Sequence, residues 1–200
     1  IFKIDKTDLL HRGLASLPPE VQHFVLQTEP VEITKSNRHS VVHRDVLMDY
    51  IGVKRYDTAG KVIGESRFLG LFTSPVYYQK TTEIPYIRSK AKRVMEAAGF
   101  DRSGHSGKAL KAALEFFPRD ELFQISFDDL LEMTLGIVSL EERPDIRAFF
   151  RRDRFERFVS CFVYMPRDKF NTYVREEIAH TLERHLNGKI STFYSQLTDS

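Results

Sequence analysis

Apolar residues recur with a helical period in the middle of the chain. One stripe runs from Pro85 to Ala98 and predicts a helix with Gly99 as its left-handed C-terminal residue; it consists of Ile87, Ala91, Val94, Met95 and Ala98. A second helix, capped by Ser106 and ended by Pro118, is predicted by the stripe of Ala109, Leu110, Ala113, Leu114 and Phe117. These two helices form a predicted connector over residues 81–118.

Residues 1–80 predict a partial mixed sheet domain. A helix is expected at Leu17–Gln27, where Pro18 and Pro19 suit the first turn. The clearest hairpin joins Leu47–Tyr56 to Lys61–Phe72 through a turn in which Gly60 takes a positive φ. Two further short strands are expected at Val31–Lys35 and Val41–His43.

Residues 119–200 predict one strand–helix–strand–strand–helix–strand unit. Its strands are Glu121–Ser126, Ile146–Phe150, Phe158–Tyr164 and Ile190–Leu197. Ser126 opens the first helix, and the second covers about Thr172 to Asn187. This order builds a ferredoxin-like sandwich, so the whole chain is predicted to be α+β. That sandwich hosts regulatory ligand-binding modules, RNA-binding modules and interaction domains.

Composition sets bounds on the function. The net charge is +2, from 30 basic and 28 acidic side chains, which is too balanced to indicate a nucleic-acid or membrane partner. The single cysteine, Cys161, excludes an internal disulfide and is expected to be a small buried residue of a strand. No apolar run approaches membrane-spanning length, and we expect a cytoplasmic location. The first residue is Ile1, not Met, and we expect a part of a longer polypeptide.

Three patterns suggest chemistry but lack required residues. The run Gly104–Lys108 precedes a helix, but Arg102 stands where a Walker loop needs glycine. Glu177 and His180 match one Glu-x-x-His element of a di-iron bundle, which needs two. His39 and His43 could share a strand face without a third ligand. We therefore predict no catalytic, cofactor-binding or metal-binding residue in this chain.

An arginine cluster and a central strand raise the question of RNA. The arginines are Arg143, Arg147, Arg151, Arg152, Arg154 and Arg157. We favour a solvated hairpin in which they pair with Asp145, Asp153 and Glu156. Leu122–Ile125 loosely fits the first strand of an RNA-binding ferredoxin-like module. In the third strand, Val159 and Cys161 replace the two stacking aromatics, so the motif fails at its informative positions.

Long ordered blocks across most of the chain carry a family resemblance. They are Ser40–Arg44, Asp49–Val53, Gly64–Ser74, Ile84–Pro85, His105–Leu110, Pro118–Ile125, Arg151–Phe155 and Pro166–Asp168. Together they resemble the large, very long-chain NAD-specific glutamate dehydrogenases. The stretch is similar to their amino-terminal, non-catalytic part, upstream of the glutamate- and NAD-binding domains. The resemblance implies an ACT-like module at 119–200 and a PAS-like part within 1–80.

The resemblance implies a regulatory or oligomerisation segment of an oxidoreductase of amino-acid catabolism, which deaminates L-glutamate to 2-oxoglutarate. NAD would be bound elsewhere in the parent enzyme, and the expected partners are the remainder of the polypeptide, further copies and an amino-acid effector. ACT modules that bind amino acids usually carry glycine after the first strand, and Ile125–Asp128 has none. The alternatives are a stand-alone ACT-type amino-acid sensor and, third, an RNA-binding domain.

Overall fold

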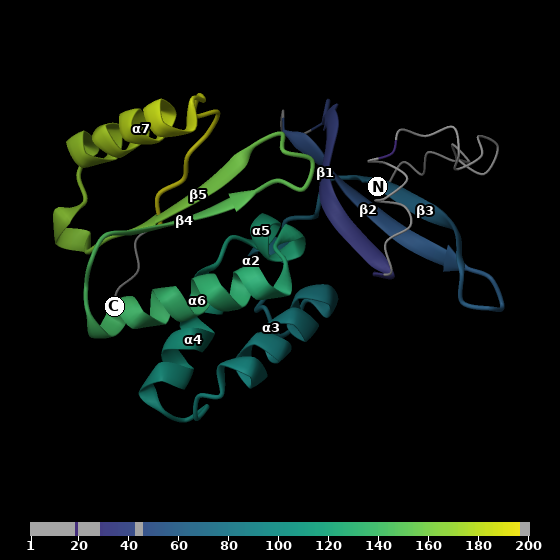
Figure 1. The fold of residues 1–200 in the computed structure, drawn as a ribbon, viewed down its shortest axis with the longest axis horizontal. Coiled ribbons are helices and arrows are strands. Elements are labelled where there is room, and N and C mark those ends of the chain that lie inside the picture. The colour runs from purple at the N-terminus through teal and green to yellow at the C-terminus, as the bar shows by residue number, and fades with distance from the viewer. Residues whose placement is uncertain (1–18, 20–28, 43–45, 197–200) are drawn as a thin grey trace. The chain divides into compact units, whose positions relative to one another are not determined.

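The computed structural model describes residues 19, 29–42 and 46–196 (Figure 1). The chain divides into two compact units. The first combines Ile1–Val94 with Leu114–Phe127, and the second combines Met95–Ala113 with Asp128–Ser200. The expected helix at Leu17–Gln27 lies outside the described residues except for Pro19. The division of the chain at residues 80 and 118 stays a prediction.

An antiparallel three-stranded sheet dominates the first unit. It has the order β1 (Val31–His39), β2 (Leu47–Tyr56) and β3 (Val62–Gly70). The predicted β2–β3 hairpin is confirmed. Asp57 closes its turn by accepting from the backbone N–H groups of Ala59 and Lys61, and Gly60 has φ +78°. This is the left-handed position that favours glycine.

Helical residues form the apolar core of the first unit. The unit contains α2 (Pro75–Tyr78), most of α3 (Pro85–Ala98) and α5 (Arg119–Gln124). The predicted stripe of α3 is buried at Ile87, Ala91 and Val94. From the sheet end, Phe72 stacks on Phe123 of α5 with ring centroids 4.2 Å apart. The prediction of Gly99 as the left-handed residue after α3 is confirmed by its φ of +67°.

The second unit holds most of α4 (His105–Phe116) and α6 (Phe127–Glu142), the strands β4 (Arg147–Arg152) and β5 (Val159–Tyr164), and α7 (Thr172–Leu186). Helix α4 begins one residue before the expected cap, Ser106. Its apolar stripe, from Ala109 to Phe117, is buried as predicted. Strands β4 and β5 pair antiparallel, and a Cβ at Gly136 of α6 would lie 2.7 Å from the ring of Phe149. This glycine therefore lets α6 approach one face of the hairpin closely.

The α+β class is confirmed, but two strands of the predicted ferredoxin-like unit are wrong. Glu121–Ser126 was expected to be a strand, and Arg119–Gln124 is helix α5. Asp120 and Glu121 favour a helix start, and the adjacent Leu122 and Phe123 are both buried instead of alternating. Residues 190–196 are exposed and form no strand. The backbone N–H of Ile190 donates to the Glu183 side chain at 3.0 Å instead of to a neighbouring strand.

The expected strand Val41–His43 is also wrong at its described residues. Val41 and Val42 are exposed and bent, because Ser40 bonds back onto the chain. Its hydroxyl donates to the carbonyl of Val42 at 2.7 Å, and the Val42 N–H donates to Ser40 Oγ at 3.2 Å. Such a turn at a serine competes with strand pairing. His43 lies outside the described residues, and within them no helix is long and apolar enough to cross a membrane.

Candidate functional site

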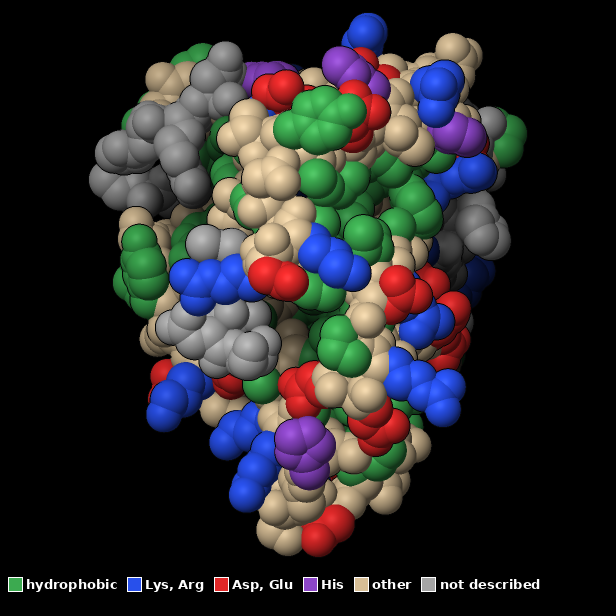
Figure 2. Space-filling model, turned by 90° about the vertical axis from the view of Figure 1, so that its left-hand side faces the viewer, with side chains coloured by type: hydrophobic (Ala, Val, Ile, Leu, Met, Phe, Trp, Pro, Cys, Tyr) green, Lys and Arg blue, Asp and Glu red, His purple; other side chains and the backbone are tan. Residues whose placement is uncertain are grey.

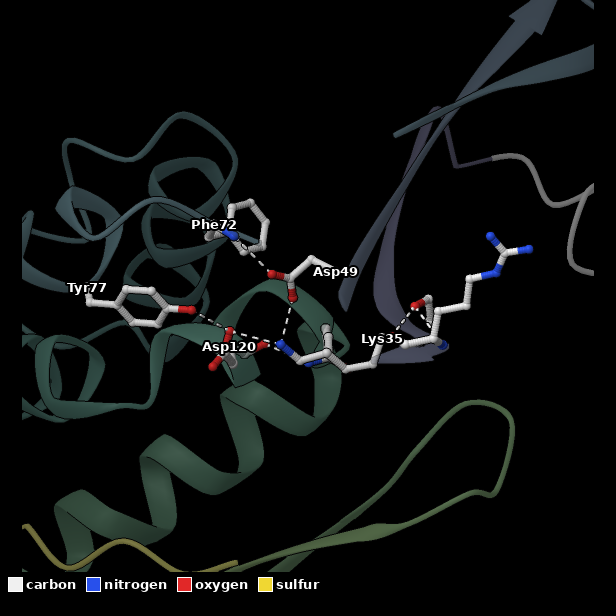
Figure 3. Close-up of polar contacts among 8 residues, drawn as sticks. Lys35, Asp49, Phe72, Tyr77 and Asp120 are labelled. Carbon is white, nitrogen blue, oxygen red and sulfur yellow. Dashed lines mark hydrogen bonds and ion pairs between the residues drawn. The ribbon is translucent and has the colours of Figure 1, made fainter. Parts of the chain in front are cut away.

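One polar cluster joins the sheet of the first unit to α2 and α5 (Figure 3). Lys35 of β1 donates to Asp49 of β2 at 2.6 Å and to Asp120 of α5 at 3.3 Å. Asp120 also accepts from the hydroxyl of Tyr77 at 3.2 Å, and Asp49 accepts from the N–H of Phe72 at 3.1 Å. The cluster thus connects four segments of the chain through one lysine and two carboxylates.

The charges of this cluster stabilise one another. Burial alone would lower the pKa of Lys35, but the carboxylates of Asp120 and Asp49 outweigh burial and raise it. Burial raises the pKa of Asp49, and the charge and hydrogen bond of Lys35 oppose that rise only in part. These interactions hold the sheet and α5 together, and Lys35 stays charged. The cluster of Lys35, Asp49 and Asp120 is called the clasp below.

A second buried network lies across β2 and β3. Glu65 accepts from Lys54 at 2.7 Å, from Arg67 at 3.0 Å and from the hydroxyl of Tyr50. The side chains of Lys54 and Glu65 are 0% and 1% exposed. Burial alone would raise the pKa of Glu65, but the hydrogen bonds from Lys54, Tyr50 and Arg67 lower it. The carboxylate is therefore held ionised by three donors.

Gly52 makes room for this carboxylate. A Cβ at Gly52 would lie 2.7 Å from Oε2 of Glu65 and 3.1 Å from the ring of Tyr50. Real Cβ atoms do not approach oxygen so closely, and three donors fix the carboxylate in place. The glycine thus serves close packing inside the sheet face.

The turn of the β4–β5 hairpin is organised by one buried carboxylate. Asp153 is 2% exposed and accepts from Nε and Nη2 of Arg157 at 2.8 and 3.0 Å. It also accepts from the backbone N–H groups of Phe155 and Arg157 at 3.0 and 3.4 Å. Burial alone would raise the pKa of Asp153, but its hydrogen bonds with Arg157 and the charge of Arg157 lower it. The prediction that the arginines pair with Asp153 is confirmed for Arg157.

The same turn displays other side chains to solvent. Arg152 pairs with Glu156 at 3.0 Å, as predicted, and both side chains are about 70% exposed. Glu156 has φ +56°, a left-handed value that is uncommon for a residue with a Cβ. Arg154 is exposed, and Phe155 is 38% exposed. Asp145, also expected to pair with an arginine, accepts from the N–H of Ile146 at 2.7 Å.

A small pocket lies between α6 and β4 in the second unit. It has a volume of about 240 Å³ and is lined by Asp129, Glu132, Met133, Ala148, Phe149 and Phe150. Four apolar residues and two acidic ones line it, and the two carboxylates come from the first turns of α6. Seen from the end at which α7 lies, apolar side chains also stand exposed among charged ones (Figure 2). A second depression, at the end of α7, is lined by polar residues from His180 to Lys189.

The Gly104–Lys108 run packs tightly against a loop. A Cβ at Gly107 would lie 2.1 Å from the carbonyl oxygen of Asp101, and Asp101 accepts from the backbone and hydroxyl of Ser103. Gly107 is therefore needed for the close approach of α4 to the carbonyl of Asp101. Residues 105–108 already belong to α4, so the prediction that this run is a loop before the helix is wrong except at Gly104.

The remaining residues that the sequence singled out do not come together. Glu177 and His180 are exposed on α7, and His39 is exposed at the end of β1. No group of three metal-ligating side chains occurs in the part of the chain that the structure describes. Cys161 was expected to be buried, and this is wrong: it is only half-buried on β5, opposite Phe150 of β4. Leu122 and Phe123 are buried in helix α5 and offer no stacking surface for bases.

Comparison with known proteins decides the family. Residues 84–143 match the family model described as glutamate dehydrogenase, helical motif 1. Residues 147–200 match the model described as glutamate dehydrogenase, ACT2 domain. The chain belongs to the large NAD-specific glutamate dehydrogenases.

Curated relatives extend the match over the whole chain. It is 40% identical over 200 residues to the NAD-specific glutamate dehydrogenase of Halomonas elongata and 39% identical over 198 residues to that of Pseudomonas aeruginosa. The Mycobacterium tuberculosis protein of the same name is 36% identical over 150 residues, or 75% of this chain. The chain spans 12% of the length of the first two relatives and 9% of the third.

The family match assigns the clusters to parts of a glutamate dehydrogenase. The helical motif covers α3 to α6, including Asp120 of the clasp, and the ACT2 stretch contains the hairpin turn and α7. The chain matches the non-catalytic amino-terminal region of these enzymes, as the resemblance implied. No comparison tests the PAS-like part, which stays a prediction.

The sequence analysis missed two of the three polar clusters and the pocket. Lys54 and Glu65 flank the β2–β3 turn, and the register of that hairpin could have placed them together. Lys35 and Asp120 are 85 residues apart, and no local signal joins them. The pocket beside β4 depends on how α6 packs, which periodicity does not show.

Proposed function

We propose that this chain is a non-catalytic regulatory and assembly segment of an enzyme that deaminates L-glutamate to 2-oxoglutarate with NAD. The observation that carries the proposal is the ordered match to a helical motif and an ACT2 domain of glutamate dehydrogenase. The buried titratable groups support it, because Lys54, Glu65, Asp49 and Asp153 are engaged in short contacts that stabilise the fold. A cytoplasmic location belongs to the same proposal.

NAD binding is assigned to other parts of the parent enzyme. The chain has no Gly-x-Gly-x-x-Gly motif, and the backbone at Gly107 is packed against Asp101. Dinucleotides need a glycine turn whose N–H groups approach the pyrophosphate. The residues present therefore do not fit this cofactor.

Calorimetry and absorbance test the proposal. The chain is titrated with NAD and then mixed with L-glutamate and NAD while NADH is followed by its absorbance. We expect neither saturable binding at micromolar concentrations nor NADH production. A chain that binds NAD or reduces it with glutamate would overturn the proposal.

A stand-alone amino-acid sensor is the second candidate, supported by the ACT2 match. The expected ligand loop, Ile125–Asp128, follows helix α5 instead of a strand, which weakens this candidate. Titration with a set of amino acids separates the two. Saturable binding to this chain alone would favour the sensor.

A further inference from the structure

We propose that the outer edge of β5 pairs with the same edge of a second copy of this chain, so that the two hairpins form one continuous sheet. The inference rests on the assembly role proposed above and names its surface. That surface, called the β5 edge below, consists of Val159, Cys161 and Val163. All three residues belong to the second unit.

The backbone of the β5 edge points away from β4. Strands β4 and β5 form a two-stranded sheet, and beside it the N–H of Asp153 donates to the carbonyl of Phe158 at 2.9 Å (Figure 1). In the antiparallel register that continues from this bond, alternate residues direct their N–H and C=O groups at the partner strand. Ser160, Phe162 and Tyr164 face β4 in this way, so the backbone groups of the β5 edge point outward. Within the part of the chain that the structure describes, these outward groups meet no further strand.

The β5 edge lacks the features with which proteins usually protect an exposed strand. Charged side chains, proline and bulges prevent unplanned pairing at the edges of sheets. Strand β4 carries Arg147, Arg151 and Arg152, β3 carries Glu65 and Arg67, and β1 has charged residues and an irregular register. Strand β5 reads Val-Ser-Cys-Phe-Val-Tyr and, among the strands of the described residues, is alone in having no charged side chain. Its composition therefore favours pairing with another strand.

The side chains of the β5 edge match a second copy of themselves. Val159, Cys161 and Val163 lie on one face of β5, because alternate side chains of a strand share a face. Val159 is 40% exposed, and Cys161 is half-buried. The order valine–cysteine–valine reads the same in both directions. A two-fold axis at Cys161 therefore sets valine against valine on either side of a cysteine pair.

The residues that flank the β5 edge allow this arrangement. The same two-fold register sets Phe158 opposite Tyr164 and Arg157 opposite Met165 of the second copy, so no like charges face each other. Arg157 keeps its contacts with Asp153 within its own hairpin. Pairing of the β5 edge with β4 of another copy would be head-to-tail, would leave a free β5 edge each time and would propagate as a filament. The two-fold arrangement closes after two copies and leaves only the arginine-rich strand β4 at the outer edges.

Disulfide formation tests this register on the unmodified chain. Cys161 is the single cysteine, and a directly opposed, hydrogen-bonded pair holds two Cα atoms about 5.5 Å apart, within the range of a disulfide. Mild oxidation with diamide should convert most of the chain into a covalent dimer on a non-reducing gel. The matched control moves the cysteine by combining Cys161→Ser with Val159→Cys. Its two cysteines would lie roughly 13 Å apart along the paired strands and should crosslink at least about tenfold more slowly.

Sedimentation velocity over a concentration series measures the same interface without a covalent bond. We expect the unmodified chain and Cys161→Ser to dimerise. Cys161→Lys sets two ammonium groups against each other at the two-fold axis and should weaken the dimer at least about tenfold. Val159→Glu and Val163→Lys should each weaken it, and the double variant should recover most of the loss, because each new glutamate then faces a new lysine. Val41→Lys is the control, since Val41 is 98% exposed and lies in the first unit.

The other outcomes overturn the proposal. Circular dichroism and thermal melts establish that each variant is folded, and oxidation of the unmodified chain tests the interface even if a charged variant unfolds. A chain that stays monomeric, a moved cysteine that crosslinks as fast as Cys161, or a double variant no better than the singles each excludes this interface. A monomer with β5 amides protected from hydrogen exchange would assign the edge to residues 190–196 of the same chain. The NAD and glutamate titrations are read separately, so failure of the interface and failure of the proposed function are distinguishable.

Discussion

The three-stranded sheet and the β4–β5 hairpin both contain a buried carboxylate, but they use it differently. In the sheet, Glu65 and Lys54 are enclosed, and the donors around Glu65 come from the same sheet face. In the hairpin, Asp153 is enclosed while its partner Arg157 is partly exposed, and the turn around it displays Arg154 and Phe155.

The second unit also exposes more of its large apolar side chains than the three-stranded sheet does. Helix α7 has no buried residue, and Phe150, Val159 and Tyr173 of the second unit are 40–70% exposed. In the sheet, exposure of large apolar side chains at this level is confined to Tyr56 and Ile63, next to the β2–β3 turn. Exposed apolar surface of this kind commonly marks an interaction site. The sheet is therefore a closed scaffold, whereas the second unit leaves more of its apolar side chains exposed.

The largest effect is expected when the charge of Glu65, buried in the three-stranded sheet, is removed. Glu65→Gln takes a buried ionic partner from Lys54 and Arg67, so we expect a loss of about 3–5 kcal/mol in the free energy of unfolding. Chemical denaturation followed by circular dichroism measures it. Glu142→Gln, at the exposed end of α6, is the control and should change stability by less than about 0.5 kcal/mol. Equal losses in the two variants would contradict the closed scaffold.

Asp153→Asn should have a smaller and local effect. The amide keeps the size of the carboxylate but loses the bidentate pair with Arg157, and we expect a cost of about 2 kcal/mol, typical of bonds to a charged group. Amide exchange by mass spectrometry should show faster exchange in residues 147–164 and unchanged exchange in β1–β3. Faster exchange throughout would mean that the two regions are not independent.

Gly52→Ala tests the close approach within the sheet. The added methyl group meets the fixed Glu65 carboxylate, and we expect a loss of about 1–2 kcal/mol from overpacking. Gly60→Ala is a useful comparison, because its Cβ would meet nothing within 4 Å and only its positive φ is strained. If Gly52→Ala melts like the parent chain, the Glu65 network is looser than the distances indicate.

Mild acid, down to about pH 4, should produce the smallest net change, because the shifted carboxylates oppose one another there. The pKa values of Glu65 and Asp153 are lowered in the fold, so their stability is present above the ordinary values of 4.5 and 3.8 and is lost as pH falls through the folded values. Asp49 has a raised pKa, so its protonation as pH falls relieves a cost. We expect melting temperatures to fall only modestly near pH 4 and steeply below it. A steep fall already at pH 6 would contradict these directions.

Periodicity predicted the parts of the fold that are long enough to show it. The stripes of α3 and α4 extend over several turns, and their central residues, such as Val94 and Leu110, are fully buried. Helix α5 has six residues, too few to separate a helical from an alternating pattern, and the sequence predicted a strand at Glu121–Ser126 instead. The tail after Gly188 alternates like a strand but has no described strand beside it.

Only part of the candidate site could be predicted from the sequence. Arg157 and Asp153 are four residues apart across a turn, so their pairing could be predicted. The sequence also shows that α6 is acidic and that the hairpin is rich in arginine. The pocket that brings Glu132 beside Phe150 requires the packing of a helix on a strand, and no spacing rule encodes it.

Hydrogen–deuterium exchange followed by mass spectrometry tests most directly the claim that the three-stranded sheet is a closed scaffold and the second unit is more open. The account predicts slower amide exchange in β1–β3 than in β4, β5 and α7. Exchange in the sheet as fast as in the hairpin would contradict it.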